Sequence, residues 1–330
     1  MDKRRYLLFG AATLLCLVST AMSLCMGAAQ LSPLQLWQAV TGQADGIGRV
    51  IFWYTRLPRT AACLLSGSGL AVSGCVIQRV LHNQLASPGI IGINAGAGLA
   101  VNLCCALGLL SGWAIAGWAF AGAVGAVVLV VFLSSRTGAS RTTVILAGVA
   151  SNSILTALSE GVVTLLPEVG MLGSDFRMGG FSSVSHTRLI PAGILIVCAL
   201  AVTMTLCGEL DVLELGEDTA RSLGLSVKRT QNLFLILAAL MAGASVSFAG
   251  LLGFVGLIVP HAARRLVGGE SRVLLPFCAL GGAGFVTLCD VLSRVLFRPH
   301  ELPVGILISV MGGPFFLLLL LKKKGGRGYD

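Results

Sequence analysis

The sequence predicts an all-helical integral membrane protein with about ten transmembrane helices, and its composition supports this fold class. Hydrophobic residues make up 55% of the 330 residues, charged residues only 11%, and the mean hydropathy is +0.90. A typical soluble chain carries about 25% charged residues, so a soluble enzyme and a disordered chain are both excluded. The apolar residues form long runs, not the short alternating segments of a membrane β-barrel.

The apolar runs divide into ten predicted spans, each near the roughly 20 residues that a helix needs to cross the hydrocarbon core. In chain order they are 6–28, 60–81, 90–110, 113–133, 143–166, 189–207, 231–250, 251–267, 273–297 and 302–321. The first run is too long for a signal-peptide core and indicates a retained span. The eighth is short enough to be partly re-entrant. Segment 31–41 is expected to form a short interfacial helix. We therefore expect a single polytopic domain over residues 1–330.

The distribution of basic residues predicts that both termini face the cytoplasm. Ten spans put the termini on one side, and 16 of the 23 lysines and arginines, including every lysine, then fall on that side. The positive-inside rule accounts for the net charge of +9 without a nucleic-acid partner. The expected surroundings of the chain are membrane lipid.

The longest polar interruption lies between the sixth and seventh spans, at about residues 208–230. Acidic residues come first and basic residues last. Gly224 can end one short helix and Ser226 can cap the next. The segment is therefore predicted to form short cytoplasmic helices that dock a partner.

The fifth span carries a polar stripe with a four-residue spacing, which places its members on one helix face. The stripe and its neighbours are Asn152, Ser153, Thr156, Ser159, Glu160 and Thr164. An ionisable side chain inside a span is expected to face a cavity or a partner instead of lipid. A pore-lining face is favoured over the alternative, hydrogen bonding between helices.

Small residues and outer charges give three further expectations. The 43 glycines include close-packing spacings such as Gly92-x-x-x-Gly96 and the run Gly250, Gly253, Gly256. Asp290 and Arg294, one turn apart, are expected to form a local ion pair. Arg56 and Arg59 lie on the outer side, against the charge rule, and an acidic partner is one reason to keep them there.

Four motifs occur in a fixed order over about residues 56–317. They are Arg56-Leu-Pro-Arg59 with the Ser-Gly-Leu-Ala-Val-Ser-Gly run ending at Gly74, Asn83-Gln-Leu-Ala-Ser-Pro-Gly-Ile-Ile-Gly92, Leu215-Gly-Glu-Asp-Thr-Ala-Arg-Ser-Leu-Gly224, and Gly253-Phe-Val-Gly-Leu-Ile-Val-Pro-His-Ala-Ala-Arg264 continuing to Pro314. Together they resemble the membrane permeases of ABC importers for iron-siderophores, haem and cobalamin.

The resemblance implies ten helices per subunit and a complex of two permease subunits, two ABC ATPase subunits and an extracytoplasmic binding protein, in the bacterial cytoplasmic membrane. The second permease subunit is either another copy of this chain or a homologous one. No P-loop occurs in the sequence, so ATP and Mg are expected on the ATPase subunits. This chain is expected to bind no cofactor or metal and to catalyse no reaction. The cargo is a metal chelate, with ferric siderophore placed first by its frequency in the family, and haem or cobalamin as alternatives.

The resemblance also assigns roles to residues. Binding-protein docking falls on Arg56, Arg59 and Arg294, and the translocation path falls on the polar stripe of the fifth span. Arg177 lies near a position where the family often carries a tryptophan, and this departure from the family's pattern makes it a separate candidate contact for anionic cargo. ATPase coupling falls on Leu215, Gly216, Glu217, Ala220, Leu223 and Gly224.

Two other protein classes were weighed against this one. An ion-gradient-driven secondary transporter would use Glu160 and Asp290 as coupling carboxylates and would need no ATPase. An intramembrane protease would need paired aspartates, a Ser/His dyad or His-Glu-x-x-His, and the four histidines lie at span ends without such a signature. The secondary transporter is the main alternative.

Overall fold

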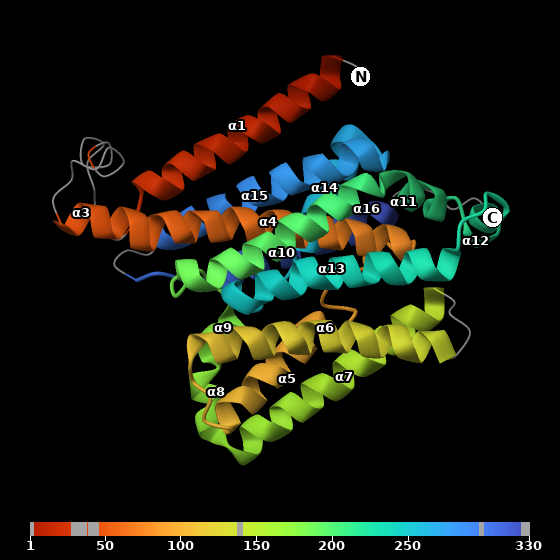
Figure 1. Ribbon diagram of the computed structural model, residues 1–330. Helices are drawn as coiled ribbons and strands as arrows, with labels where there is room; N and C mark the ends of the chain where they lie inside the picture. The colour runs from red at the N-terminus through yellow and green to blue at the C-terminus, as the bar shows by residue number, and fades with distance from the viewer. Residues whose placement is uncertain (1–2, 28–37, 39–45, 137–140, 297–299, 325–330) are drawn as a thin grey trace.

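The computed structural model describes residues 3–27, 38, 46–136, 141–296 and 300–324, and this part of the chain is helical with no strand (Figure 1). The predicted helix at 31–41 lies outside the described residues except for Gln38. The longer helices are α1 (Lys3–Cys25), α4 (Leu57–Val80), α5 (Ile93–Ala106), α6 (Gly112–Arg136), α7 (Arg141–Leu165), α10 (His186–Thr205), α13 (Val227–Ala249), α14 (Val255–Val267), α15 (Ser271–Val295) and α16 (Val304–Lys324). The shorter ones are α3 (Gly46–Val50), the π-helix η1 (Ile51–Arg56), α8 (Pro167–Leu172), α9 (Ser174–Met178), α11 (Cys207–Glu214) and α12 (Glu217–Ser222).

Each predicted span corresponds to one of the longer helices, so the all-helical membrane fold is confirmed. Among the described residues, seven helical segments are long and apolar enough to cross a membrane, and two shorter apolar helices are α5 and the first part of α16. Helix α14 has 13 residues. At 1.5 Å per residue it is about 20 Å long, shorter than a hydrocarbon core of about 30 Å.

The predicted start of the second span, at about residue 60, is wrong. Helical structure runs without a break from Gly46 through α3, η1 and α4 to Val80. Pro58 lies in the first turn of α4, directly after the π-helix η1, and cannot donate a backbone bond there. The His186 ring lies 2.5 Å from the carbonyl of Trp53 in that preceding turn. The flanking arginines suggested a polar boundary, but they are buried and paired inside the protein, so the helix continues through them.

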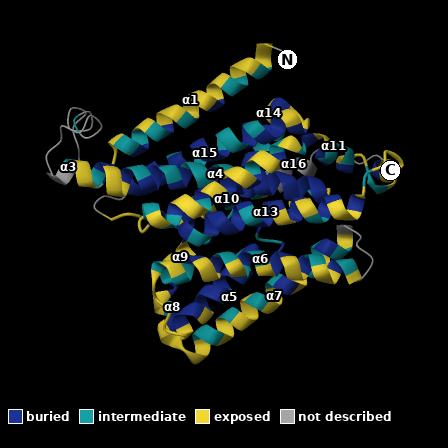
Figure 2. Ribbon diagram, in the orientation of Figure 1, coloured by how far each residue is buried: buried dark blue, intermediate teal, exposed yellow. Residues whose placement is uncertain are grey.

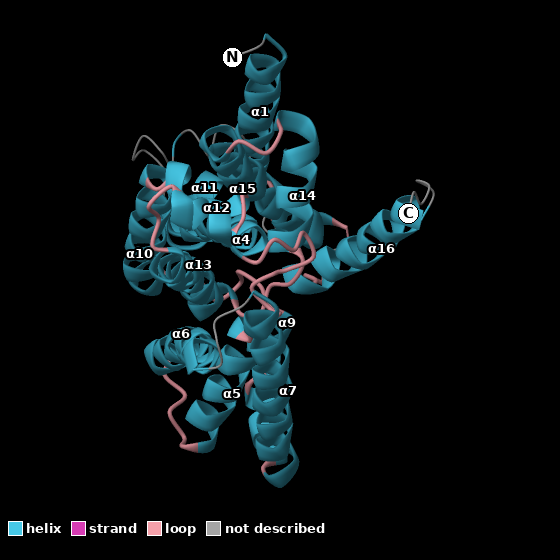
Figure 3. Ribbon diagram, turned by 90° about the vertical axis from the view of Figure 1, so that its right-hand side faces the viewer, coloured by secondary structure: helices cyan, strands magenta, loops and turns pink. Residues whose placement is uncertain are grey.

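Helix α4 lies at the centre of the bundle and packs against α15, α13, α14 and α10. The apolar window of α4 is 78% buried, that of α13 72% and that of α15 67%, whereas those of α1 and α7 are each 17% buried. Figure 2 shows this contrast between the central helices and α1. Helix α13 also contacts α6 and so joins the α5–α6–α7 layer to the rest. Figure 3 shows that α16 leans away from the bundle along its length.

Glycines allow three close helix crossings. A Cβ on Gly67 of α4 would lie 2.2 Å from the carbonyl oxygen of Gly282 in α15, and one on Gly74 would lie 2.0 Å from that of Gly256 in α14. Gly96 of α5 approaches α6 in the same way. The expected packing role is therefore confirmed for Gly96 and Gly256. Gly253, by contrast, has no atom within 4 Å of an added Cβ.

The two ends of the bundle differ in what they carry. We call the end where α4 begins the Arg59 end, and the opposite one the α12 end. Helix α1 begins and α16 finishes on the α12 side (Figure 1). The start of α1 and the end of α16 therefore lie at the same end of the bundle.

Candidate functional site

Two arginines and two carboxylates meet in an ion-pair cluster at the Arg59 end. The Arg59 guanidinium lies 3.0 Å from Oδ1 of Asp290 and 2.8 Å from Oε2 of Glu301. Nη2 of Arg294 lies 2.8 Å from Oδ2 of the same Asp290, which confirms the ion pair expected one turn apart on α15. Asp290 is fully buried, so the two guanidinium groups supply the charge that its carboxylate needs away from water.

The same cluster holds the end of α1. Nη1 of Arg294 donates to the carbonyl of Met26 at 2.9 Å, and Nη1 of Arg56 donates to that of Cys25 at 2.9 Å. A second bond from Arg56 reaches the carbonyl of Leu24. The last carbonyls of a helix have no partner within it and carry a partial negative charge, so two cations at this position stabilise the end of α1.

The three arginines assigned to binding-protein docking are therefore brought together, but inside the protein. Their exposures are 3% for Arg56, 8% for Arg59 and 3% for Arg294. The internal partners Asp290 and Glu301 and the end of α1 account for their presence on this side of the bundle. Docking remains a prediction for them.

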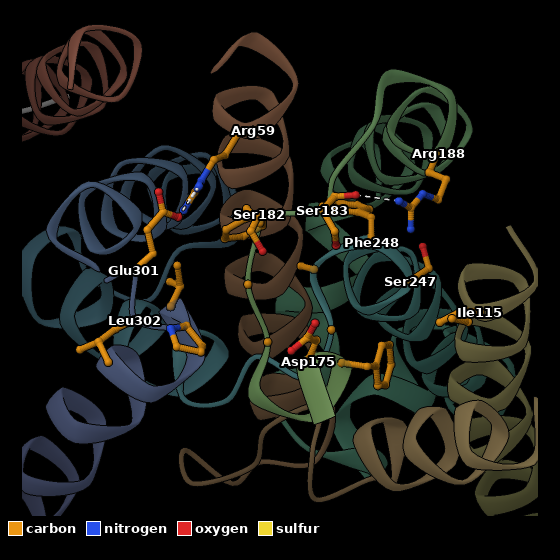
Figure 4. A pocket seen from close by; sticks show the side chains of 18 of the residues that line it. Arg59, Ile115, Asp175, Ser182, Ser183, Arg188, Ser247, Phe248, Glu301 and Leu302 are labelled. Carbon is orange, nitrogen blue, oxygen red and sulfur yellow. Dashed lines mark hydrogen bonds and ion pairs between the residues drawn. The ribbon is translucent and has the colours of Figure 1, made fainter. Parts of the chain in front are cut away.

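A cavity of about 430 Å³ opens beside this cluster (Figure 4). Its walls come from the starts of α4, α10 and α16, from the end of α13 and from the segment after α9. Arg59 points to Glu301 on one side, and on the other Arg188 donates to the carbonyl of Ser183 at 2.6 Å. The lining also includes three hydroxyl groups, three phenylalanine rings and the carboxylate of Asp175, with further apolar side chains: Ser182, Ser183, Ser247, Phe176, Phe181, Phe248, Ile115, Leu172, Leu302 and Pro303. Such a mixture suits a partner segment with both polar and apolar groups.

Below the cavity, three chain segments meet through their backbones. The N–H of Leu251 donates to the carbonyl of Phe176 at 2.9 Å, and the N–H of Gly305 donates to that of Gly179 at 3.1 Å. Gly250 has φ +70°, and a Cβ there would lie 2.4 Å from the Phe176 oxygen. The ends of α9 and α13 and the start of α16 are thus fixed to one another.

The polar stripe of α7 lies largely on an exposed face of the subunit, and its later part lines a second cavity. This cavity, of about 240 Å³, is bordered by Asn102, Ser159, Glu160, Val163, Thr164 and Arg177. The structure therefore brings Arg177 and Glu160, which were assigned separately, to one site. The amide of Asn102 donates to Oγ of Ser159 at 2.8 Å. Sequence analysis missed Asn102, although a lone asparagine in an apolar span was a usable signal.

The earlier stripe residues do not border this cavity. Asn152 is half-buried, whereas Ser153 and Thr156 are exposed. The Ser153 hydroxyl donates to the carbonyl of Val149 at 3.1 Å, within its own helix. The amide of Asn102 also donates to the carbonyl of Ser159, at 3.4 Å. Bonding between helices therefore accounts for Ser159 among the stripe residues.

The coupling segment forms two short helices, α11 and α12, as predicted. Gly216 (φ +111°) separates them and Gly224 (φ +84°) follows α12. Ala220 is buried, while Leu215 and Leu223 on either side of α12 are 61% and 62% exposed. Ser226 precedes α13, but its hydroxyl makes no capping bond, so that detail of the prediction is wrong. Two exposed leucines beside a short helix form a small apolar surface at the α12 end.

The all-helical bundle, with its buried central helix and paired short helices at one end, is that of a multi-pass membrane protein. Residues 15–322 match the FecCD transport family, and the chain belongs to this family. This confirms the resemblance to the ABC-importer permeases drawn from the four motifs.

Similar proteins cover nearly the whole chain. The vitamin B12 import system permease protein BtuC of Salmonella paratyphi A is 36% identical over 311 residues, 92% of each chain, and that of Salmonella typhi is 37% identical over the same share. A solved metal-chelate type ABC transporter in an inward-facing conformation superposes with a TM-score of 0.84 at 29% identity, covering 96% of this chain and 99% of that one. PsaBC from Streptococcus pneumoniae shares the fold, with a TM-score of 0.59 at 17% identity, covering 86% of this chain and 94% of that one.

Proposed function

We propose that this chain is the permease subunit of an ABC importer that carries cobalamin into the cytoplasm. The observation that supports this cargo is the 36–37% identity, over 92% of each chain, to permeases named for vitamin B12 import. Cobalamin was one of two alternative cargoes predicted from the sequence, beside haem, and these relatives favour it over ferric siderophore.

The proposed complex lies in the bacterial inner membrane with the α12 end in the cytoplasm, where both termini then lie. Two permease subunits pair with two ATPases, and a binding protein delivers cargo at the Arg59 end. ATP and Mg act on the ATPases, and this chain binds no cofactor and catalyses no reaction. ATP-driven closure of the ATPases moves the coupling helix α12, and the bundle tilts so that the path opens alternately to each side.

Each proposed role uses a surface described above. The ATPase contacts the face made by Leu215, Gly216, Glu217, Ala220, Leu223 and Gly224, where two leucines are exposed. The cargo passes along the exposed face of α7 and the cavity that Glu160 and Arg177 border. The binding protein meets the arginine cluster and the neighbouring cavity of about 430 Å³.

A ferric siderophore is the second candidate cargo. The solved transporter of metal-chelate type, with a TM-score of 0.84, favours this broader class. Both cargoes need an ABC ATPase, so they differ only in what the binding protein and the path accept.

The test is uptake by cells that lack this gene and by the same cells complemented with it. Radiolabelled cyanocobalamin, a ferric siderophore and haem are offered in parallel, with ATP depleted or with the ion gradient collapsed. We expect complementation to restore cyanocobalamin uptake alone, and ATP depletion to abolish it. Restored uptake of the ferric siderophore would show that the siderophore, and not cobalamin, is the cargo. Uptake that survives ATP depletion and fails with the ion gradient would instead establish a secondary transporter.

The same assay tests Arg177. We expect Arg177→Ala to raise the half-saturating cargo concentration about fivefold, since a lost hydrogen bond costs about 1 kcal/mol. Arg136→Ala, in an exposed arginine of α6 that borders neither cavity, is the control. An unchanged concentration dependence in Arg177→Ala would remove this residue from the path.

A further inference from the structure

A buried arginine, Arg79, fastens the coupling segment to the central helix. It lies in the last turn of α4, and its side chain is 2% exposed. Nη2 of Arg79 lies 2.6 Å from Oδ1 of Asp211 and also contacts the carboxylate of Glu214, both on α11. Its Nη1 donates to the carbonyl of Gly269 at 2.6 Å. One guanidinium group therefore joins three parts of the chain: α4, α11 and the connection between α14 and α15.

Further bonds hold α11 in the same place. Oδ1 of Asp211 accepts the N–H of Ser271, the first residue of α15, at 3.1 Å. The ring of His82, just after α4, lies 2.9 Å from the carbonyl of Leu213. His82 has φ +48°, a conformation that is rare for a residue other than glycine. The attachment of α11 thus uses both its side chains and its backbone.

The position of α11 determines where α12 begins. Only Leu215 and Gly216 lie between the two helices. A connection of two residues leaves α12 little freedom to move without α11. Any displacement of α12 is therefore carried through α11 to Arg79 and into α4.

Helix α4 can carry this displacement to the other end of the bundle. Its apolar window is 78% buried among its neighbours. The 20 residues from Arg79 back to Arg59 correspond to about 30 Å of helix. The helix thus has one buried arginine cluster at the α12 end and another at the Arg59 end, and both clusters tie it to other elements.

We infer that Arg79 is a positioning residue for energy coupling: it holds α11 and α12 against α4 and the α14–α15 connection, so that movement of α12 moves the transmembrane bundle. This rests on the proposed function, because it takes α12 as the contact with the ATPase. The four motifs that identified the family do not include Arg79.

The test uses the complete importer reconstituted in liposomes with its ATPase and binding protein. Cyanocobalamin uptake and ATP hydrolysis are measured together, and their ratio reports coupling. We expect Arg79→Ala to lower uptake per ATP about fivefold or more, the usual lower range of coupling between sites, while hydrolysis continues. Arg79→Lys keeps the cation and should restore much of the ratio, which a loss of packing alone would not explain.

Arg5→Ala is the matched control. It breaks another arginine–carboxylate pair at the α12 end, Arg5 to Glu270 at 3.2 Å, which is solvent-exposed and does not touch α11. We expect a wild-type ratio in this variant. If Arg79→Ala does not assemble, Asp211→Asn with Glu214→Gln removes the partners instead and leaves the arginine in place. A wild-type ratio in that double variant or in Arg79→Ala would overturn the inference.

Hydrogen exchange separates this inference from the proposed function. In the reconstituted complex, amides of residues 207–224 should exchange faster in Arg79→Ala than in wild type, and not in Arg5→Ala. This readout needs no cargo. If the wild-type complex takes up no cyanocobalamin, the proposed cargo is wrong but the positioning role of Arg79 is unaffected. If exchange is unchanged in Arg79→Ala, the positioning role is wrong.

Discussion

Each of the three outer arginines has more than one polar partner within the chain. Arg59 has two carboxylates, Arg294 has Asp290 and the end of α1, and Arg56 has two carbonyls of α1. Glu301 is the most accessible of these partners, with a side chain 31% exposed. An acidic side chain of a binding protein can therefore replace Glu301 as a partner of Arg59 more readily than it can replace the buried Asp290.

Reversing the charge of Arg59 is expected to destabilise the permease before it affects docking. Arg59→Glu places a third carboxylate beside Asp290 and Glu301, and breaking a buried pair costs about 3–5 kcal/mol. Glu301→Gln is the milder counterpart because its side chain is 31% exposed. Thermal unfolding of the purified protein measures both variants. If Arg59→Glu unfolds like wild type and only binding-protein affinity falls, Arg59 serves docking alone.

Among the elements, the helices were the most predictable part and the contacts between them the least. Ten apolar runs gave ten helices because apolar content and length are local properties of the sequence. The end of the short helix α12 near Gly224 was predictable too, since glycine readily adopts a positive φ. The start of the second span was not, because the pairing of Arg59 with Asp290 joins residues 231 positions apart.

The candidate sites show the same division. The stripe on α7 follows from spacing alone, but its meeting with Asn102 and Arg177 depends on three helices packing together. Arg79 carried no local signal, because its partners Asp211 and Glu214 lie 132 and 135 residues away. Pairings of this kind follow only from the tertiary structure.

Close packing of α4 on α15 gives a prediction for a single glycine. Gly67→Ala sets a Cβ 2.2 Å from the Gly282 backbone oxygen, where no flexible side chain can yield. We expect a loss of about 1–3 kcal/mol, as for other overpacked cores. Unfolding by a denaturing detergent measures it. Gly125→Ala, where nothing lies within 4 Å of the added Cβ, is the control and should be neutral or stabilising. Equal stability of the two variants would mean that α4 and α15 can move apart to accommodate the added methyl group at little cost.

For the whole molecule, the two ends of α4 differ in the groups that they carry. The arginine cluster with its cavity of about 430 Å³ lies at one end, and the fastened coupling helices lie at the other. A binding protein and an ATPase act from opposite sides of the membrane. The proposed orientation therefore assigns one partner to each end of the same buried helix.

A native cysteine can test this orientation. Cys25 is exposed at the end of α1 next to the arginine cluster, and so lies on the outer side if the termini are cytoplasmic. Cys198 is also exposed but lies within the apolar helix α10, so the loss of Cys25 is needed to show which thiol is labelled. We expect a membrane-impermeant maleimide to label Cys25 in intact spheroplasts, and Cys25→Ser to abolish the signal. In a Cys25→Ser background, Leu223→Cys at the α12 end should be labelled only after permeabilisation. The reverse pattern would place the coupling helices outside, where no ATPase could reach them, and would reject the orientation together with the importer mechanism built on it.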